Sequence, residues 1–355
     1  MKIDLKPPSL QGFQMPAEWI PHEATWLAWP QNASTWPGKR LARVEEIFLQ
    51  ILEALLPNEK VHLLVQDEAE GHKISSRLKK MGIGTKNLTP HPVPTTDVWI
   101  RDYGPTFIVT QEGKKAWCKW IFNAWGKKYE GLMKDNEIFS PDAKKAASLI
   151  PFPCFAAEIV LEGGSLEVNG AGTCLVTEQC LLNPNRNPEL TRADIEGHLK
   201  NFLGISQILW LGRGIAGDDT DGHIDDIARF VSPDTLVMAF EENTFDENHG
   251  ILKANWERLT WQENLKGKKW NLIKLPMPKP VAAEGVRLPA SYANFYLANE
   301  VVILPVFKDL YDERAIKVLK EVFPRREIIS IDCRDLVYGL GAIHCVTQQE
   351  PAAIK

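Results

Sequence analysis

Leu166-Glu167-Val168-Asn169-Gly170-Ala171-Gly172-Thr173-Cys174-Leu175-Val176 is the stretch that decides the fold. Two short apolar runs flank Asn169-Gly170, a pair that predicts a type I′ turn and therefore a β-hairpin. A helix is predicted over residues 191–202, with Asp194 where a capping box usually has Glu. The apolar run at 208–211 predicts the next strand. These elements together predict one β-β-α-β unit.

The same mixture of elements continues in both directions along the chain. Apolar spacing predicts helices over 41–56, 69–81 and 313–323, and strands over 61–65, 227–231 and 327–331. Hairpins mixed with helices are not the strict alternation of a doubly wound sheet. We therefore expect an α/β protein of roughly five β-β-α-β units. No linker rich in Pro, Gly or Ser divides the chain, which predicts a single domain over residues 1–355.

The composition narrows the class of partner. A net charge of −5 gives no reason to expect nucleic acid and suits a small cationic substrate. No apolar run approaches the roughly 20 residues that a membrane span needs, and the N-terminus has no signal-peptide pattern. The six cysteines have no zinc-site spacing, which predicts reduced thiols in a cytoplasmic protein. The sequence leaves the oligomeric state open and is compatible with a homo-oligomer.

Cys345 is the candidate nucleophile. It ends the run Gly339-Leu340-Gly341-Ala342-Ile343-His344-Cys345, whose small residues would let a substrate approach the sulfur. A cysteine on its own more often fills a core. The interpretation of Cys345 therefore depends on the partners that other segments supply.

A glycine-rich stretch, Gly212–Gly217, matches the G-x-G-x-x-G pattern and follows a predicted strand. A dinucleotide site would need a helix to begin there and receive the pyrophosphate. Instead Asp218, Asp219 and Asp221 follow, and carboxylates repel phosphate. We interpret the stretch as a flexible loop.

The acidic segment that follows contains His223 and Asp225. In an extended chain the two side chains point to the same side, because side chains alternate along a strand. A histidine and a carboxylate on one wall could act as proton carrier and cation anchor. The segment could equally be a solvated acidic turn, or a calcium or zinc site, although it lacks the EF-hand pattern and a second nearby histidine.

Two further carboxylates, Asp102 and Glu162, have neighbours in the sequence that would suit a bound ligand. Asp102 lies near Trp99, and a carboxylate beside an indole suits a planar cation. Asp102 could instead pair with Arg101. Glu162 follows an apolar run and precedes two glycines, so it is expected to be partly buried with room for a ligand close by. The alternative is a structural Glu in a bulge at a strand end.

These residues together favour one kind of chemistry. Carboxylates at 102, 162 and 225 can bind a guanidinium ion through paired hydrogen bonds. The thiolate of Cys345 can attack an electrophilic carbon. His223 beside a carboxylate can stay protonated and donate to a leaving amine. The combination predicts nucleophilic substitution at the carbon of a guanidinium or amidinium ion.

Several segments resemble those of the agmatine deiminases and the bacterial-type peptidylarginine deiminases: Pro21–Pro30, Trp99–Pro105, Phe122–Gly126, Leu161–Ser165, Gly222–Asp226 and Ile343–Pro351. The resemblance runs in matching order over most of the chain. It implies the pentein fold, a five-bladed α/β-propeller with the active site in its central channel. It implies no metal and no organic cofactor.

The resemblance also implies roles for particular residues. Cys345 would be the nucleophile, His223 the general acid and base, and Glu162 the residue that orients His223. For the substrate, Asp102 and Asp225 would hold the guanidinium and Trp99 would wall the pocket. The implied reaction is hydrolysis of agmatine to N-carbamoylputrescine and ammonia through an amidino-cysteine, a step of putrescine biosynthesis.

The sequence departs from the family pattern at two places. Leu340 replaces the middle glycine of a common Gly-Gly-Gly run, and Lys127-Lys128 stand where small residues are expected. Asp219 is a candidate partner for the distal amine of agmatine. Three other functions stay open at this point: hydrolysis of protein-bound arginine, a non-catalytic pentein-like binding protein, and a metallohydrolase.

Overall fold

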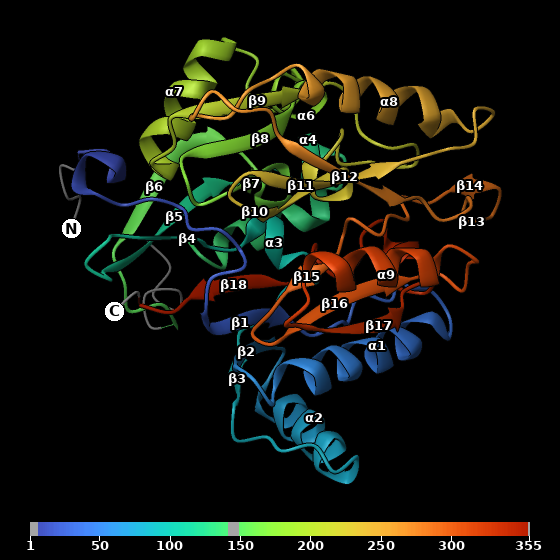
Figure 1. The fold of residues 1–355 in the computed structure, drawn as a ribbon. Helices are drawn as coiled ribbons and strands as arrows, with labels where there is room; N and C mark the ends of the chain where they lie inside the picture. The colour runs from blue at the N-terminus through green and yellow to red at the C-terminus, as the bar shows by residue number, and fades with distance from the viewer. Residues whose placement is uncertain (1–5, 141–148, 354–355) are drawn as a thin grey trace.

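The computed structural model describes residues 6–140 and 149–353. Within them, five sheets share one connectivity, an antiparallel pair of strands followed by a third strand parallel to the second. The expected α/β class is therefore confirmed. The helices α7, α8 and α2 lie at the outer edge of the ribbon view (Figure 1).

The stretch that predicted the unit forms the sheet with β7 (Glu167–Val168), β8 (Thr173–Thr177) and β9 (Gln207–Leu211), with α6 (Glu178–Leu181) and α7 (Arg192–Leu203) between the last two strands. The predicted capping box is confirmed, because Thr191 and Asp194 exchange hydrogen bonds at the start of α7. The predicted type I′ turn is wrong. Of the pair that would form it, Gly170 has a positive φ and Asn169 does not. The connection runs from 169 to 172, and the Asn169 side chain accepts the N–H groups of Ala171 and Thr173.

Three further sheets repeat this order. One contains β4 (Thr106–Val109), β5 (Lys115–Ile121) and β6 (Cys154–Val160), with α4 (Ala124–Lys127) and the 3-10 helix η2 (Glu130–Glu137) after β5. Another contains β10 (Ala228–Ser232), β11 (Thr235–Phe240), α8 (Glu247–Thr260) and β12 (Asn271–Pro276). The last contains β15 (Tyr296–Leu297), β16 (Val301–Val306), α9 (Asp312–Val322) and β17 (Glu327–Asp332).

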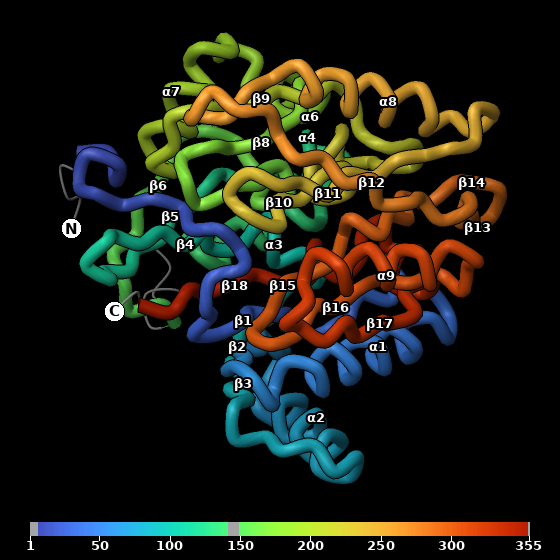
Figure 2. The backbone as a smooth tube through the Cα atoms, in the orientation of Figure 1, coloured from blue at the N-terminus to red at the C-terminus, as the bar shows by residue number. Residues whose placement is uncertain are grey.

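The remaining sheet joins the two ends of the chain. Its order is β18 (Gln348–Pro351), β1 (His22–Ala28), β2 (Lys60–Val65) and β3 (Leu88–Pro92), with α1 (Arg40–Leu55) and α2 (Glu68–Lys80) in its two crossovers. The last strand, β18, is antiparallel to β1, and Figure 2 shows the red and blue segments side by side. A separate short hairpin is formed by β13 (Ala282–Ala283) and β14 (Val286–Arg287).

The predicted helices begin and end within about two residues of their expected bounds, because each has an apolar stripe that packs against its own sheet. In α1 the buried side chains include Val44, Phe48, Ile51 and Leu55, at the spacing of one helical face. The glycine pattern at 212–217 follows β9, and the next element is a 3-10 turn far too short to receive a pyrophosphate. The interpretation as a loop is therefore confirmed.

Short helical turns precede the first strand of several sheets. These are α3 (Ile100–Tyr103) before β4, η3 (Gly163–Ser165) before β7, η4 (Ile224–Asp226) before β10, and η5 (Val337–Gly339) shortly before β18. A fifth turn, η1 (Pro8–Gln11), lies near the N-terminus and contacts α7. The turn α3 contacts η3, and η3 contacts η4. The segments that lead into different sheets therefore meet in one place.

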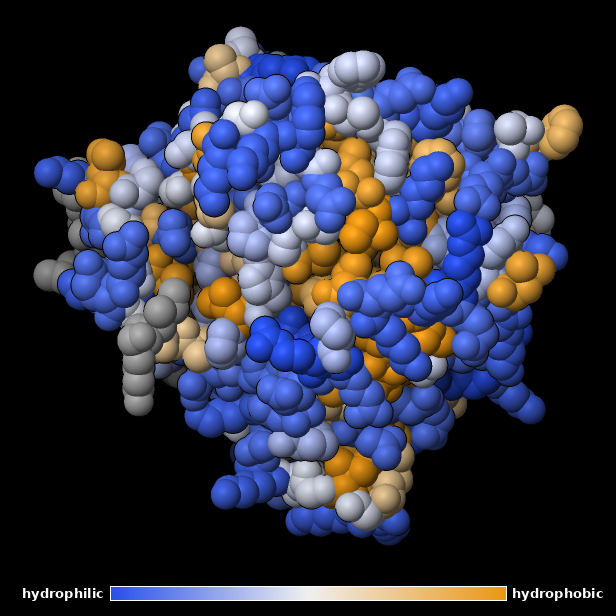
Figure 3. Space-filling model, viewed as in Figure 1, coloured by the Kyte–Doolittle hydropathy of each residue, from blue (hydrophilic) through white to orange (hydrophobic). Residues whose placement is uncertain are grey.

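The face drawn in Figure 3 is largely hydrophilic, with apolar side chains gathered near its middle. Among large apolar side chains, Phe245 and Trp261 are 97% and 77% exposed. Across the described ranges, no helix is both long enough and apolar enough to cross a membrane.

Candidate active site

A cavity of about 620 Å³ opens where these turns meet. Four of the predicted site residues line it: Trp99, Asp102, Asp219 and Cys345. The other three are at most 1% exposed: His223 lies 3.8 Å from Asp102, Asp225 lies 3.7 Å from Cys345 Sγ, and Glu162 lies 3.9 Å from His223. All seven predicted residues therefore gather around one cavity, although they come from segments far apart in the sequence.

Cys345 lies between η5 and β18, and its side chain is held by Asn294, from the segment before β15. The amide nitrogen of Asn294 donates to Cys345 Sγ at 3.2 Å, and its carbonyl oxygen accepts the backbone N–H of His344 at 2.9 Å. Burial raises the pKa of the Cys345 thiol well above its usual range, and the carboxylates of Asp225 and Asp226 raise it further. In the free protein the thiol is therefore protonated.

His223 stands between two carboxylates. Its Nδ1 is 3.8 Å from Asp102 Oδ1, and its Nε2 is 3.9 Å from Glu162 Oε2. Both distances exceed a hydrogen bond, and neither ring nitrogen has a hydrogen-bond partner within the described residues. Burial alone would lower the pKa of His223, but Asp102 and its other neighbours raise it well above its usual range. The ring is therefore a protonated, unpartnered donor.

Glu162 is held by Arg186, a residue that the sequence analysis missed. Arg186 Nε donates to Glu162 Oε1 at 2.7 Å, and Arg186 Nη1 donates to Asp221 at 2.8 Å. Burial would raise the pKa of Glu162, but Arg186 lowers it, so the carboxylate stays ionised. Nothing in the sequence near Arg186 marks it, because its partner lies 24 positions away.

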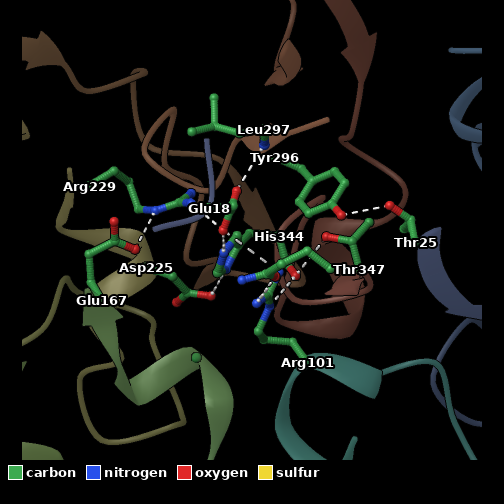
Figure 4. A network of polar contacts seen from close by, with 12 residues as sticks. Glu18, Thr25, Arg101, Glu167, Asp225, Arg229, Tyr296, Leu297, His344 and Thr347 are labelled. Carbon is green, nitrogen blue, oxygen red and sulfur yellow. Dashed lines mark hydrogen bonds and ion pairs between the residues drawn. The ribbon is translucent and has the colours of Figure 1, made fainter. Parts of the chain in front are cut away.

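Asp225 is fixed on one side and free on the other. Its Oδ2 lies 2.8 Å from His344 Nδ1, and the other ring nitrogen of His344 lies 2.8 Å from Glu18 Oε2 (Figure 4). Arg229 contacts the same oxygen of Glu18 at 2.8 Å. Asp225 Oδ1 is buried and has no hydrogen-bond partner within the part of the chain that the structure describes. It is an acceptor available to a cation.

Asp102 is oriented by two donors. Its Oδ1 accepts the backbone N–H of Gly164 at 3.0 Å, and its Oδ2 accepts the indole N–H of Trp125 at 2.8 Å. Burial raises the pKa of Asp102 to about 6, against the lowering effect of His223. Trp125 was part of a motif noted in the sequence, but its role required the fold.

Gly164 explains why the sequence has glycines after Glu162. A Cβ atom there would lie 2.6 Å from His223 Nδ1, 2.9 Å from Asp102 Oδ1 and 3.2 Å from Asp225 Oδ2. Three of the predicted site residues therefore pack against a single backbone position that has no side chain. A Cβ atom at the neighbouring Gly163 would lie 2.1 Å from the backbone carbonyl oxygen of Arg101, so the expectation that these glycines let a backbone segment come close is confirmed.

One alternative considered for Asp102 is excluded, and one expectation for His223 and Asp225 was wrong. Asp102 does not pair with Arg101, which is buried and donates instead to the carbonyl of His344 and the side chain of Gln349. His223 and Asp225 do not lie on an extended strand, because residues 224–226 form the turn η4. They still reach the same centre, because both side chains pack against Gly164.

Leu340 has a positive φ of 72° and lines the cavity. Left-handed backbone is costly for leucine, which explains why a glycine is common at this position in the family that the sequence resembles. The flanking Gly341 packs against Trp99, since a Cβ there would lie 2.4 Å from the indole.

One group of side chains offers metal-ligand atoms. Atoms of Glu162, Cys180 and His223 lie within 4.8 Å of one another and are buried. The guanidinium of Arg186 already binds the Glu162 carboxylate and would oppose a further cation. The arrangement favours a histidine–carboxylate pair over a metal centre.

The fold and site define an α/β protein with a buried thiol beside a cavity lined by carboxylates. A family model described as Porphyromonas-type peptidyl-arginine deiminase matches residues 14–351, and the chain belongs to this family. A Legionella pneumophila (strain Paris) protein, which carries a provisional agmatine deiminase name, is 38% identical over 98% of each chain.

The solved structure of the agmatine deiminase of Enterococcus faecalis is 30% identical, covers 99% of both chains and superposes with a TM-score of 0.90. An amidinotransferase of Microseira wollei, 14% identical with a TM-score of 0.52 over 96% of this chain and 97% of its own, shares the fold alone.

Proposed function

We propose that this chain is an agmatine deiminase, a hydrolase that converts agmatine to N-carbamoylputrescine and ammonia. The observation that carries the proposal is the arrangement around the cavity: a thiol at Cys345, with carboxylates of Asp102 and Asp225 to which no Lys or Arg of the described residues is bound. Relatives named as agmatine deiminases match nearly the whole chain. The product is a precursor in putrescine biosynthesis.

In the proposed reaction the substrate guanidinium binds between Asp102 and Asp225. Its positive charge offsets the carboxylates that, together with burial, keep the Cys345 thiol protonated, so the thiol loses its proton to solvent when substrate is bound and becomes a thiolate. The thiolate then adds to the guanidinium carbon. His223 donates its proton to the departing nitrogen, and ammonia leaves.

The second half of the proposed reaction hydrolyses the amidino-cysteine. His223, now neutral, removes a proton from water, and the oxygen adds to the same carbon. The carbon–sulfur bond breaks, which releases the ureido product and restores the thiolate. Glu162, held ionised by Arg186, stabilises the protonated form of His223 throughout.

The cavity favours agmatine over free arginine. Its described lining includes the carboxylates of Asp97, Asp102 and Asp219 but no Lys, Arg or His. An α-carboxylate would therefore meet no cation and would face like charge, whereas an ammonium would be attracted. We assign Trp99 as a wall of the guanidinium pocket and Asp219 as the partner of the distal ammonium.

We further propose that the five sheets form the blades of one propeller domain around this site. In support, each sheet contacts the next in a ring, through β18 and β4, α7 and β6, β10 and β7, α9 and β12, and α1 and β17. All six cysteines are free thiols, which supports a reducing, cytoplasmic compartment.

Ammonia release from agmatine, free arginine and an arginine peptide tests the substrate assignment. We expect agmatine to be strongly preferred; preference for the peptide would favour the protein-arginine alternative. Intact-mass analysis after mixing with agmatine should detect an amidino adduct that Cys345→Ala lacks. Absence of both ammonia and adduct with all three substrates would favour a binding protein, and loss of activity on chelation would favour a metallohydrolase.

A further inference from the structure

One short segment, Asn123–Tyr129, contacts carboxylates at two different places in the cavity. Trp125 donates its indole N–H to Asp102 Oδ2 at 2.8 Å. Four residues later, the hydroxyl of Tyr129 donates to Asp219 Oδ2 at 2.6 Å. Both aromatic residues and both aspartates line the cavity. The segment therefore connects the proposed guanidinium end with the proposed ammonium end.

The backbone of this segment is unusual. Four consecutive residues, Ala124 to Lys127, have positive φ values of 52°, 53°, 86° and 65°, and only the third is glycine. Left-handed backbone costs roughly 1–2 kcal/mol per residue other than glycine. Such strain persists only where the surrounding structure holds it, and it gathers at functional sites.

Neighbouring residues hold this left-handed backbone in place. Asn123 Oδ1 accepts the backbone N–H of Gly126 at 2.7 Å, and Asn123 Nδ2 donates to the carbonyl of Asn185 at 3.0 Å. Gly126 packs so closely that a Cβ would lie 2.4 Å from the Asn185 side chain. The rings of Trp125 and Tyr129 also pack edge to face, with centroids 5.8 Å apart. The two aromatic side chains therefore support each other in position.

Lys128, which departs from the expected pattern of small residues, does not pair with the Asp219 carboxylate. Its ammonium binds the backbone carbonyl of Asp219 and the carboxylate of Asp221 at 2.8 Å. The carboxylate of Asp219 accepts a neutral phenol hydroxyl instead. Its negative charge therefore stays available to a ligand, while its position is fixed.

We propose that Tyr129 is a specificity-determining residue, which holds Asp219 in place for the charged tail of the substrate while Trp125 holds Asp102 for the guanidinium. The inference rests on the proposed function and adds to it the residue that positions the partner of the charged substrate tail. The strained turn between the two aromatic residues sets the position of one carboxylate relative to the other.

Kinetics with two substrates separate the two ends of the cavity. Agmatine has a guanidinium and a charged tail, whereas 1-guanidinobutane has the same guanidinium and chain length with a neutral tail. At pH 8 the Asp219 carboxylate is ionised. We expect Tyr129→Phe to raise KM for agmatine about fivefold, with kcat within about twofold, and to leave KM for 1-guanidinobutane unchanged.

Trp125→Phe keeps an aromatic ring, although a smaller one, but loses the indole N–H that orients Asp102. We expect it to lower kcat/KM for both substrates by the same factor. Tyr338→Phe is the matched control, because Tyr338 also lines the cavity but its hydroxyl donates to Glu284 at 3.1 Å. This variant should keep the wild-type ratio of kcat/KM between the two substrates. Thermal unfolding of each variant shows that it is folded.

The outcomes are distinct. If Tyr129→Phe changes both substrates equally, or neither, or if Tyr338→Phe shifts the ratio as much, the inference about Tyr129 is wrong while the deiminase function stands. If the wild-type protein releases ammonia from neither substrate, the proposed function itself is wrong. Because Tyr129 is 39% exposed, its variant tests the inference even if Trp125→Phe does not fold.

Discussion

Gly164 shows how much of the site depends on a single backbone position. His223, Asp102 and Asp225 all lie within 3.2 Å of the place where its Cβ would be. A protein interior is close-packed and resists such an insertion. At the residue scale, the charged groups of the site are therefore positioned by hydrogen bonds and also by a backbone position that has no side chain.

Gly164→Ala should lower kcat/KM for agmatine by roughly 100-fold, because displacing reacting groups by about 1 Å costs about that much. Steady-state ammonia release measures the effect. Gly197→Ala is the control, since nothing lies within 4 Å of its added Cβ in α7. The control should keep full activity. Near-normal activity in Gly164→Ala would show that the three groups need not stay in place.

The pH dependence of kcat/KM should have an acidic limb near pH 6. The pKa of Asp102 is raised to about 6 by burial, so the carboxylate is ionised above that pH and becomes protonated as the pH falls through it. A protonated Asp102 loses its charge for the guanidinium, and activity falls. The neutral-tailed 1-guanidinobutane is the substrate to use, because the pKa of Asp219 is also raised to about 6. A limb below pH 5 would contradict this assignment.

At the scale of elements, the left-handed turn α4 is the one that neither apolar periodicity nor residue preference for φ would predict. Its apolar and small residues carry no helix or strand period, and three of its four residues prefer a negative φ. The turn exists because the Asn123 side chain accepts the backbone N–H of Gly126, because the Asn185 carbonyl holds that side chain, and because Gly126 fits against Asn185. The element is therefore imposed by its neighbours.

Gly126→Ala should destabilise the protein by more than about 1 kcal/mol, since the position combines a positive φ of 86° with a close contact. Gly12→Ala is the matched control: its φ is 82°, and nothing lies within 4 Å of the added Cβ. Denaturant unfolding of both variants separates backbone strain from the contact with Asn185. Equal losses of stability would mean that the contact contributes nothing.

For the whole molecule, the decisive feature is the pairing of β18 with β1. The strand that follows Cys345 closes the sheet that the N-terminal strand begins. Within β18, Glu350 accepts the indole N–H of Trp26 at 3.0 Å and pairs with Lys115 of β5 at 2.6 Å. Cys345, the proposed nucleophile, is therefore positioned by contacts between the two ends of the chain and a neighbouring sheet.

Truncation after Thr347 removes β18 and should abolish both activity and cooperative unfolding. Truncation after Ala353 keeps the strand and should preserve both. Circular dichroism with thermal unfolding, together with ammonia release, measures the two outcomes. A stable, active protein without residues 348–353 would show that closure between the chain ends is dispensable.

Much of the fold and of the candidate site could be predicted from the sequence. The helices at 40–55, 68–80, 192–203 and 312–322 follow from apolar spacing and caps, which are local properties. The seven candidate site residues were identified by chemical type and by resemblance, and the structure brings all of them to one cavity. The prediction of a type I′ turn at Asn169-Gly170 was wrong. The Asn169 side chain instead accepts hydrogen bonds from backbone N–H groups of a longer loop.

The sequence alone predicted most of the long helices and strands beside them, and it identified side chains that could perform substitution at a guanidinium carbon, because both depend on residues close together or on chemical type. Only the tertiary structure decided the partners of those side chains. Arg186 on Glu162, Trp125 on Asp102, Asn294 on Cys345 and Tyr129 on Asp219 are all pairs between distant segments. Such pairs depend on how the sheets pack together, and no local pattern encodes that packing.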